Sequence, residues 1–245
     1  MLELVNVTKV YEQGRRQVQA VRGVSLRIDA GEFVSIMGRS GSGKSTILHL
    51  LGALDTPTTG QALFHGQDLH AMTDRQRSLL RRERIGFVFQ FFNLLPTLTA
   101  SENVALPLLL AGQRRKAANL SASAALESIG MLHRAEHLPE EMSGGEMQRV
   151  AIARALVTEP EVVLCDEPTG NLDSQNAKEI LALLRALPEP GKRSVVMVTH
   201  DLAAGRIADR LLHVKDGVID GDEAIPHPAP TIAFQGERGT AAQSP

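Results

Sequence analysis

Alternating apolar and polar positions open the chain and predict two strands. Residues 2–11 alternate, residues 12–16 form a polar turn, and residues 18–28 alternate again. A period of two is typical of strands that bury one face. Two such strands joined by a short turn predict an antiparallel β subdomain at the N-terminus.

Three short, continuous apolar runs predict a second kind of sheet. They occupy residues 33–37, 162–165 and 195–198, and helical segments separate them. Strands buried on both faces lose the alternation and belong to parallel sheets covered by helices. The expected fold class is therefore α/β, with a mostly parallel central sheet.

The middle of the chain is expected to be almost wholly helical. Thr99 with Glu102 three residues on has the form of a capping box, which starts a helix. We expect one domain over residues 1–221, with a core of residues 1–90 and 157–221 and an inserted helical subdomain over residues 91–156. The Pro-rich segment 222–245 is expected to be a flexible tail.

Composition narrows the class of protein. The net charge of -2 lacks the basic excess that nucleic-acid binders usually carry, so we expect no nucleic-acid partner. The single cysteine, Cys165, leaves no internal disulfide to form. No run approaches the roughly 20 apolar residues that span a bilayer. We expect a cytoplasmic protein that meets the membrane only through a partner.

A phosphate-binding motif follows the first apolar run. The segment reads Gly38, Arg39, Ser40, Gly41, Ser42, Gly43, Lys44 and Ser45, which fits the P-loop pattern between a strand and a helix. Its glycines let backbone N–H groups surround phosphate oxygens, while Lys44 reaches the terminal phosphates and Ser45 binds Mg2+. The alternative is a plain Gly-Ser turn, but a chance match has a probability of roughly 1%.

Two carboxylates follow the second apolar run. Asp166 and Glu167 end that predicted strand, and ligands of open α/β sheets lie at the carboxyl ends of strands. Asp166 is suited to hold Mg2+, and Glu167 to polarise an attacking water. Alternatively, Asp166 caps the following helix.

A third motif precedes the second apolar run. Ser143 and Glu146 form another predicted capping box, with Gly144 and Gly145 between them. Free N–H groups at such a helix start can also meet an anion. Nothing in this stretch identifies that anion.

In their order these motifs resemble those of the ATP-binding cassette (ABC) ATPases, over about residues 2–219. The resemblance implies that ATP contacts Tyr11, Thr46 and the P-loop residues, with Tyr11 stacked on adenine. It implies an opposite-subunit ATP contact through Ser143, Gly144, Gly145, Glu146 and Asp173. It further implies Mg2+ ligation by Ser45, Gln90 and Asp166, and catalysis by Glu167, His200, Gln90 and Lys44.

The same resemblance implies a mechanism and partners. Two copies, or one copy and a similar ATPase subunit, close on ATP and reopen after its hydrolysis to ADP and phosphate. A permease-type transmembrane subunit is then driven from the cytoplasmic side of the bacterial cell membrane. The sequence of residues 89–100 and 167–173 resembles that of the lipoprotein-release and macrolide-export branch. This resemblance implies export or extraction of lipoprotein, peptide or drug.

Two other functions remain open from the sequence. The same ATPase could regulate a membrane signalling or cell-division complex without transport. A soluble ABC protein of DNA repair or translation would need tandem cassettes, a coiled-coil insertion or a basic surface, and none is visible. The arginines of residues 75–84 are expected to form a solvated helix face.

Overall fold

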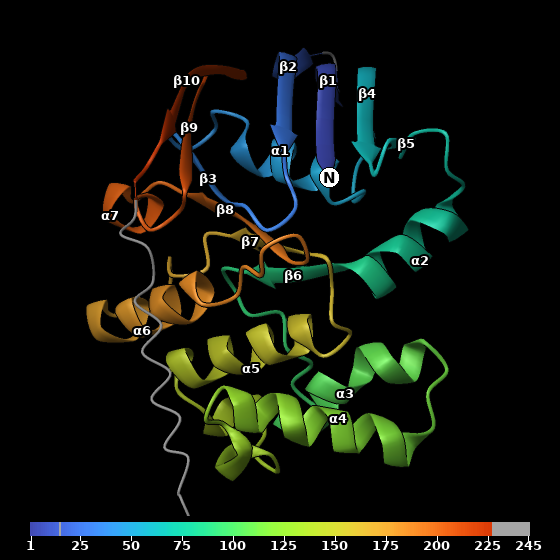
Figure 1. Cartoon of the computed structure of the whole chain (residues 1–245), viewed down its shortest axis with the longest axis vertical. Coiled ribbons are helices and arrows are strands. Elements are labelled where there is room, and N and C mark those ends of the chain that lie inside the picture. Colours follow the sequence, from blue (N-terminus) through green and yellow to red (C-terminus); the bar gives the residue numbers. More distant parts are fainter. Residues whose placement is uncertain (15, 227–245) are drawn as a thin grey trace, which may run out of the picture.

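Two sheets stacked in one body organise the protein. The computed structural model describes residues 1–14 and 16–226 (Figure 1). The strand β10 (Val218–Ala224) continues past the boundary expected at residue 221. The rest of the predicted tail, residues 227–245, lies outside the described residues.

The smaller sheet is antiparallel throughout. Its strands, in spatial order, are β2 (Arg16–Ile28), β1 (Leu2–Gln13), β4 (Thr59–Phe64) and β5 (Gln67–Asp68). The pairing of β1 with β2 confirms the predicted N-terminal antiparallel unit. The sequence analysis did not anticipate β4 or β5.

The larger sheet carries the predicted buried strands. In spatial order it contains β10, β9 (Arg210–Lys215), β3 (Phe33–Met37), β8 (Ser194–Thr199), β7 (Val162–Asp166) and β6 (Ile85–Phe89). All its neighbours run parallel except β10, which pairs antiparallel with β9. The three apolar runs therefore lie side by side as β3, β8 and β7, which confirms the α/β class.

Helices cover both faces of the larger sheet. The helix α1 (Lys44–Leu51) lies between the two sheets, where Ile47, Leu48 and Leu50 join one apolar core. On the other face, α5 (Gly144–Leu156), α6 (Ser174–Arg185) and α7 (Leu202–Gly205) complete a second core. This arrangement places the start of α1 at the carboxyl edge of the parallel strands.

A group of helices forms the end of the molecule opposite the smaller sheet (Figure 1). It contains α3 (Ala100–Leu110), α4 (Arg115–Ser128), α5 and the 3-10 turns η1 (Leu132–Arg134) and η2 (Pro139–Glu141). These helices share a third core, and α5 contributes to it with Val150 and to the second core with Ile152. No helix in the described part of the chain is long and apolar enough to cross a membrane.

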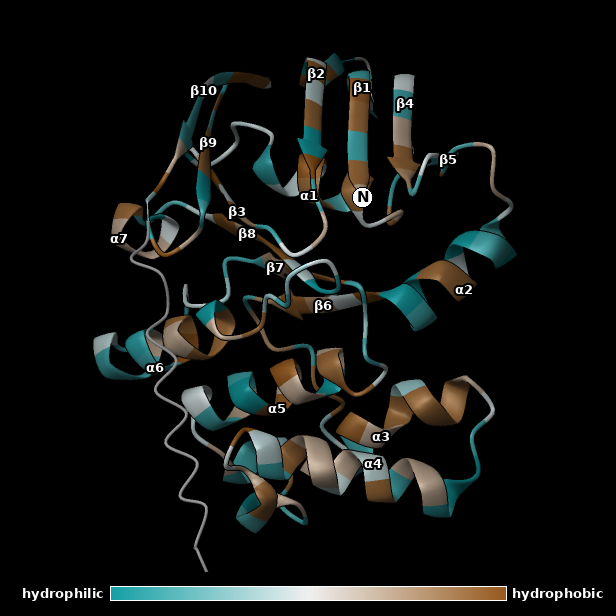
Figure 2. Ribbon diagram, in the orientation of Figure 1, coloured by the Kyte–Doolittle hydropathy of each residue, from teal (hydrophilic) through white to brown (hydrophobic). Residues whose placement is uncertain are grey.

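The helix α2 (Asp74–Arg84) corrects one expectation. It is largely hydrophilic and buries none of its residues (Figure 2). Its arginines nevertheless bind the body of the protein: Arg81 donates to the Ala53 carbonyl at 2.6 Å, and Arg82 donates to the Leu110 carbonyl at 2.5 Å. Arg84 pairs with Glu161. The expected solvated face is wrong for Arg81 and Arg82, because backbone carbonyls lie within their reach, whereas Arg84 is exposed.

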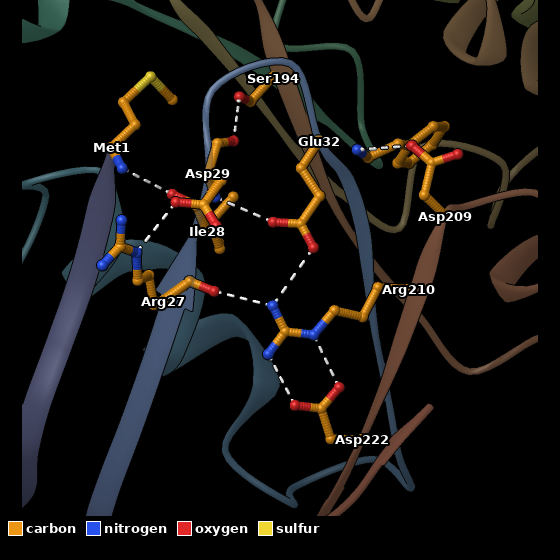
Figure 3. Close-up of polar contacts among 10 residues, drawn as sticks. Met1, Arg27, Ile28, Asp29, Glu32, Ser194, Asp209, Arg210 and Asp222 are labelled. Carbon is orange, nitrogen blue, oxygen red and sulfur yellow. Dashed lines mark hydrogen bonds and ion pairs between the residues drawn. The ribbon is translucent and has the colours of Figure 1, made fainter. Parts of the chain in front are cut away.

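One arginine joins the two sheets along their seam. Arg210 of β9 holds Asp222 through two hydrogen bonds of 2.7 and 2.6 Å (Figure 3). It also donates to the Arg27 carbonyl at the end of β2 and to Glu32. The planar guanidinium group has five N–H donors, so one arginine can hold several acceptors at once. The seam therefore ties the β9–β10 hairpin to the turn before β3.

Candidate nucleotide-binding and catalytic site

The loop between β3 and α1 has the backbone shape that phosphate binding requires. Gly41 has φ of 78° and Gly43 has φ of 104°, in the left-handed region that glycine adopts without strain. Gly43 starts α1 without a side-chain cap, so its first N–H groups are available to an anion. A cavity of about 800 Å³ opens in front of the loop and is lined by residues 38–42 and His200, among others.

Two polar side chains of this loop fit an anion. The Lys44 side chain is buried, and its Nζ donates to the Arg39 carbonyl of its own loop at 2.8 Å. The Ser42 hydroxyl is buried and, among the described residues, lacks a hydrogen-bond partner. A buried polar group without a partner costs free energy. Phosphate oxygens would give Ser42 an acceptor and Lys44 a counter-charge.

The β9–β10 hairpin packs against the phosphate loop. The Gly217 N–H donates to the Ser42 carbonyl at 2.9 Å. A Cβ at Gly38 would overlap the Val214 carbonyl of β9, so only glycine allows this approach. The phosphate loop is thus fixed by contacts within one chain.

The structure brings Asp166 next to the phosphate loop. The Ser45 hydroxyl donates to Asp166 Oδ1 at 3.1 Å, across 121 residues of sequence. Burial raises the pKa of Asp166 above its usual value, the Glu167 charge adds to this effect, and the Ser45 hydrogen bond opposes it. A hydroxyl and a carboxylate are hard oxygen donors of the kind that Mg2+ prefers. The pair fits the predicted metal site.

Glu167 lies one residue beyond β7 and contacts the predicted histidine. His200 Nδ1 lies 2.7 Å from Glu167 Oε2. Glu167 has φ of 47°, and its N–H donates to the Val198 carbonyl of β8 at 3.0 Å. A left-handed non-glycine residue carries strain, and such strain is frequent at active sites. The backbone thus fixes this carboxylate at the edge of the sheet.

Gln90 contacts the loop before α6. Its Nε2 donates to Asn171 Oδ1 at 3.2 Å, and Asn171 Nδ2 donates back to the Gln90 carbonyl at 3.1 Å. These contacts join the end of β6 to the segment that contains Asp173. The role of Gln90 as a metal ligand and catalytic residue stays a prediction.

Tyr11 lies on β1 beside the start of α1. Its hydroxyl donates to Asp55 Oδ2 at 2.8 Å, and Lys9 Nζ lies 4.9 Å from the centre of its ring. Burial and the Asp55 hydrogen bond raise its pKa, while a hydrogen bond with Thr46 opposes the rise. The structure therefore ties Tyr11 to Asp55, in the turn that follows α1.

The third motif starts α5 as its capping box predicts. The Glu146 N–H donates to Ser143 Oγ at 3.3 Å, and the Ser143 N–H donates to Glu146 Oε2 at 2.8 Å. Arg134 Nε donates to the other Glu146 oxygen at 2.8 Å. None of the residues 143–146 lines the described cavity at the phosphate loop. The two glycine-rich motifs therefore do not meet in the cavity of a single chain.

Asp173 caps a helix within its own chain. Its Oδ1 accepts from the Gln175 and Asn176 N–H groups at 3.0 and 2.9 Å, at the start of α6. These hydrogen bonds, led by the one from Asn176, lower the pKa of Asp173. Its contact with an opposite subunit stays a prediction.

Sequence reasoning missed several residues around the site. Lys9 and Asp55 surround Tyr11, Asn171 holds Gln90, and Arg134 holds Glu146. Most of these pairs join residues that are distant in sequence, so no local sequence pattern predicts the contacts. The contact between Arg134 and Glu146 spans 12 residues across irregular turns, where helical periodicity gives no guide.

A glycine-rich loop at the carboxyl edge of a parallel sheet, with two carboxylates beside it, defines a P-loop nucleoside triphosphatase. A family model described as "ABC transporter" matches residues 21–170, more than half of the chain. The chain therefore belongs to the ABC transporter family, as an ATP-binding and ATP-hydrolysing subunit.

Two similar proteins support the assignment to the ABC transporter family. The chain is 48% identical to the lipoprotein-releasing system ATP-binding protein LolD of Psychrobacter arcticus, over 89% of this chain and 96% of that protein. It is 48% identical to the macrolide export ATP-binding/permease protein MacB of Chlorobaculum tepidum, over 91% of this chain but 34% of that protein. The resemblance to this branch is confirmed.

A solved structure has the same fold. It is a dimeric post-hydrolysis state of the ATP-binding cassette MJ0796 bound to ADP and Pi, with a TM-score of 0.85 and 42% identity. The match covers 93% of this chain and 100% of that chain.

Proposed function

We propose that two copies of this chain, or one copy and a similar subunit, enclose ATP between them and drive a transmembrane partner. Each nucleotide would lie between the P-loop of one copy and Ser143, Gly144 and Gly145 of the other. The observation that carries this is the separation of the two motifs within one chain, where α1 and α5 pack on opposite faces of the larger sheet. The dimeric state of the similar cassette supports it.

Each polar residue then has one role. The P-loop N–H groups and Lys44 bind the phosphates and stabilise the charge that develops during transfer. Glu167 accepts a proton from the attacking water, and its contact with His200 orients the carboxylate. Ser45 and Asp166, with Gln90, would hold Mg2+, which supplies positive charge at the phosphates. Glu146 and Asp173 would complete the contact from the opposite subunit.

A groove beside α2 and α3 is the surface we propose for the transmembrane partner. Its volume is about 620 Å³, and its lining includes Leu54, Phe87, Pro107 and Leu110. Leu110 is 63% exposed, and exposed apolar surface often marks a partner site. The helical segment 91–156 would then act as the subdomain that transmits movement to the partner.

Two relatives indicate a role in export or extraction. LolD is named for lipoprotein release and MacB for macrolide export. We therefore place this chain at the cytoplasmic face of the cell membrane, in export or extraction of a lipoprotein, peptide or drug. Its contact with the membrane would pass through the permease-type partner.

Replacing the proposed general base tests the ATPase mechanism. Glu167→Gln should keep nucleotide binding but lower phosphate release by about 10²- to 10³-fold, because the amide cannot accept the proton. ATP should then hold the variant as a dimer in analytical ultracentrifugation. Glu127→Gln, on the exposed surface of α4, is the matched control and should behave as wild type. Undiminished phosphate release by the Glu167 variant would contradict the assignment.

A charge in the groove tests the partner surface. Leu110→Glu should abolish co-purification of the transmembrane subunit, because an apolar contact would have to bury a carboxylate. The isolated chain should hydrolyse ATP at the wild-type rate. Leu120→Glu is the control, since Leu120 is 74% exposed on α4 outside the groove. Equal loss of the partner in both variants, or in neither, would contradict this surface.

A further inference from the structure

A charged cluster surrounds the Tyr11 side chain and uses both oxygens of one carboxylate. Asp55 Oδ2 accepts from the Tyr11 hydroxyl at 2.8 Å, and Asp55 Oδ1 accepts from Lys9 Nζ at 2.6 Å. Lys9 also donates to the Thr56 carbonyl at 2.8 Å. The side chains of Lys9 and Asp55 are 13% and 26% exposed, so solvent screens this pair only in part. The tyrosine is therefore tied to a fixed acceptor.

The backbone links Asp55 to the helix that starts at the phosphate loop. The Leu54 and Asp55 N–H groups both donate to the His49 carbonyl of α1, at 2.9 and 3.3 Å. The Thr56 N–H donates to Asp55 Oδ1 at 2.7 Å. Asp55 therefore links the end of α1 to Tyr11 on β1 of the smaller sheet.

The protonation states favour this arrangement at neutral pH. Burial works against ionisation of Asp55, but the hydrogen bonds from Lys9 and Tyr11 outweigh it and lower its pKa. Burial and the Asp55 contact raise the pKa of Tyr11. The carboxylate is therefore ionised and the phenol remains a donor, as the contact requires.

The position of the ring indicates what this anchoring serves. Tyr11 lies on β1, which contacts α1, the helix that begins at the phosphate loop, and Lys9 lies near the ring centre. The ammonium is placed for a cation–π contact, and it and the Asp55 hydrogen bond restrict the ring. A ring fixed before binding loses little conformational freedom when a nucleobase stacks on it.

We propose that Asp55, held by Lys9, is a positioning residue that fixes Tyr11 as the platform for the adenine of ATP. This inference rests on the proposed nucleotide site. Asp55 contacts no nucleotide itself, and it acts on the base end of the ligand through the tyrosine hydroxyl. The phosphate end is bound by the P-loop and its partners, none of which contacts Asp55 in this proposal.

The test compares a ligand that has a base with one that lacks it. Asp55→Ala should raise the KM for ATP about fivefold with little change in kcat, because part of the stacking free energy is lost. The inhibition constant of inorganic tripolyphosphate, measured against ATP hydrolysis, should not change. A merely structural role would weaken both ligands alike, and that outcome would overturn the proposal.

A double-mutant cycle identifies the route of the effect. Tyr11→Phe removes only the hydroxyl and should raise the KM for ATP by a similar factor. Adding Asp55→Ala to Tyr11→Phe should then have little further effect, since the shared hydrogen bond is already absent. Additive losses would contradict positioning through the hydroxyl.

Two controls keep the outcomes distinct. If Asp55→Ala melts below the assay temperature, Tyr11→Phe alone provides the same comparison of ATP with tripolyphosphate, because it removes the same hydrogen bond and leaves the Lys9–Asp55 ion pair in place. If the wild-type chain itself fails to hydrolyse ATP, the proposed function fails. Normal hydrolysis with equal effects on ATP and tripolyphosphate overturns only the role of Asp55.

Discussion

Two helices of this protein begin at glycine-rich motifs, yet their first turns differ in one decisive respect. The helix α1 starts at Gly43 with no side-chain cap, directly after the loop that lines the cavity. The helix α5 starts at Ser143 with a complete capping box. A helix start without a cap keeps donors for a ligand, whereas a capped one has already satisfied some of them. The start of α1 is therefore suited to hold an anion, and the start of α5 is stabilised by its own side chains.

The charges around the two helix starts show the same contrast. Lys44 places a buried ammonium at the start of α1, whereas Glu146 places a carboxylate in the first turn of α5. The Ser143 N–H lowers the pKa of Glu146, and Arg134 adds to the effect, so this carboxylate is ionised at neutral pH. A carboxylate alone would repel a triphosphate, and the Arg134 ion pair balances it. The α5 motif therefore suits a supplementary contact better than a primary phosphate site.

Mixing two inactive variants is the strongest test of the different roles proposed for the starts of α1 and α5. Lys44→Ala breaks the phosphate loop, and Ser143→Arg blocks the start of α5. Each variant alone should lose at least about 10²-fold in ATP turnover. An equal mixture should recover about a quarter of the wild-type rate, because half of the dimers are mixed and each mixed dimer has one complete site.

The control for the mixture uses a chain that carries both changes. Lys44→Ala mixed with the Lys44→Ala/Ser143→Arg chain has no intact phosphate loop and should stay inactive. Phosphate release at a fixed total concentration of protein is the measurement. Failure of the first mixture to exceed its components would show that the two motifs do not complete each other across a dimer.

The same contrast explains how much of the site the sequence could predict. The phosphate loop, Asp166 and Glu167 lie at the ends of strands with strong local patterns, and the parallel sheet brings those ends to one edge. Their proximity therefore follows from the fold class. The contact between Ser45 and Asp166 forms because the carboxyl ends of parallel strands meet at one edge of the sheet.

Other features depend on tertiary contacts that no local pattern encodes. The strands β4 and β5 have weak alternation, and they join the smaller sheet through pairing of β4 with β1 and of β5 with β4. The arginines of α2 looked solvated because periodicity describes a helix in isolation, and their carbonyl acceptors belong to distant segments. Asp55 lies in an irregular turn, so its role behind Tyr11 needed the structure.

Two neighbouring glycines provide the subtler test of the α5 motif. A Cβ at Gly145 would overlap the side chain of Asn176, whereas a Cβ at Gly144 would lie 3.4 Å from Leu172, an ordinary contact. Asn176 donates to Asp173 Oδ2 at 2.6 Å, so displacing it disturbs the cap of α6. Gly145→Ala should therefore destabilise the nucleotide-free chain by about 1 kcal/mol, even after the gain in helix propensity.

Gly144→Ala should act only when two chains meet. Its nucleotide-free melting temperature should stay within about 1 °C of wild type, while Gly145→Ala should melt about 2–4 °C lower. In the Glu167→Gln background, Gly144→Ala should weaken ATP-dependent dimerisation, because its methyl group would stand where the partner's nucleotide docks. Sedimentation measurements with and without ATP separate the two effects. A Gly144→Ala chain that dimerises as well as its parent would remove this glycine from the nucleotide interface, and equal melting temperatures for the two variants would remove the steric role of Gly145.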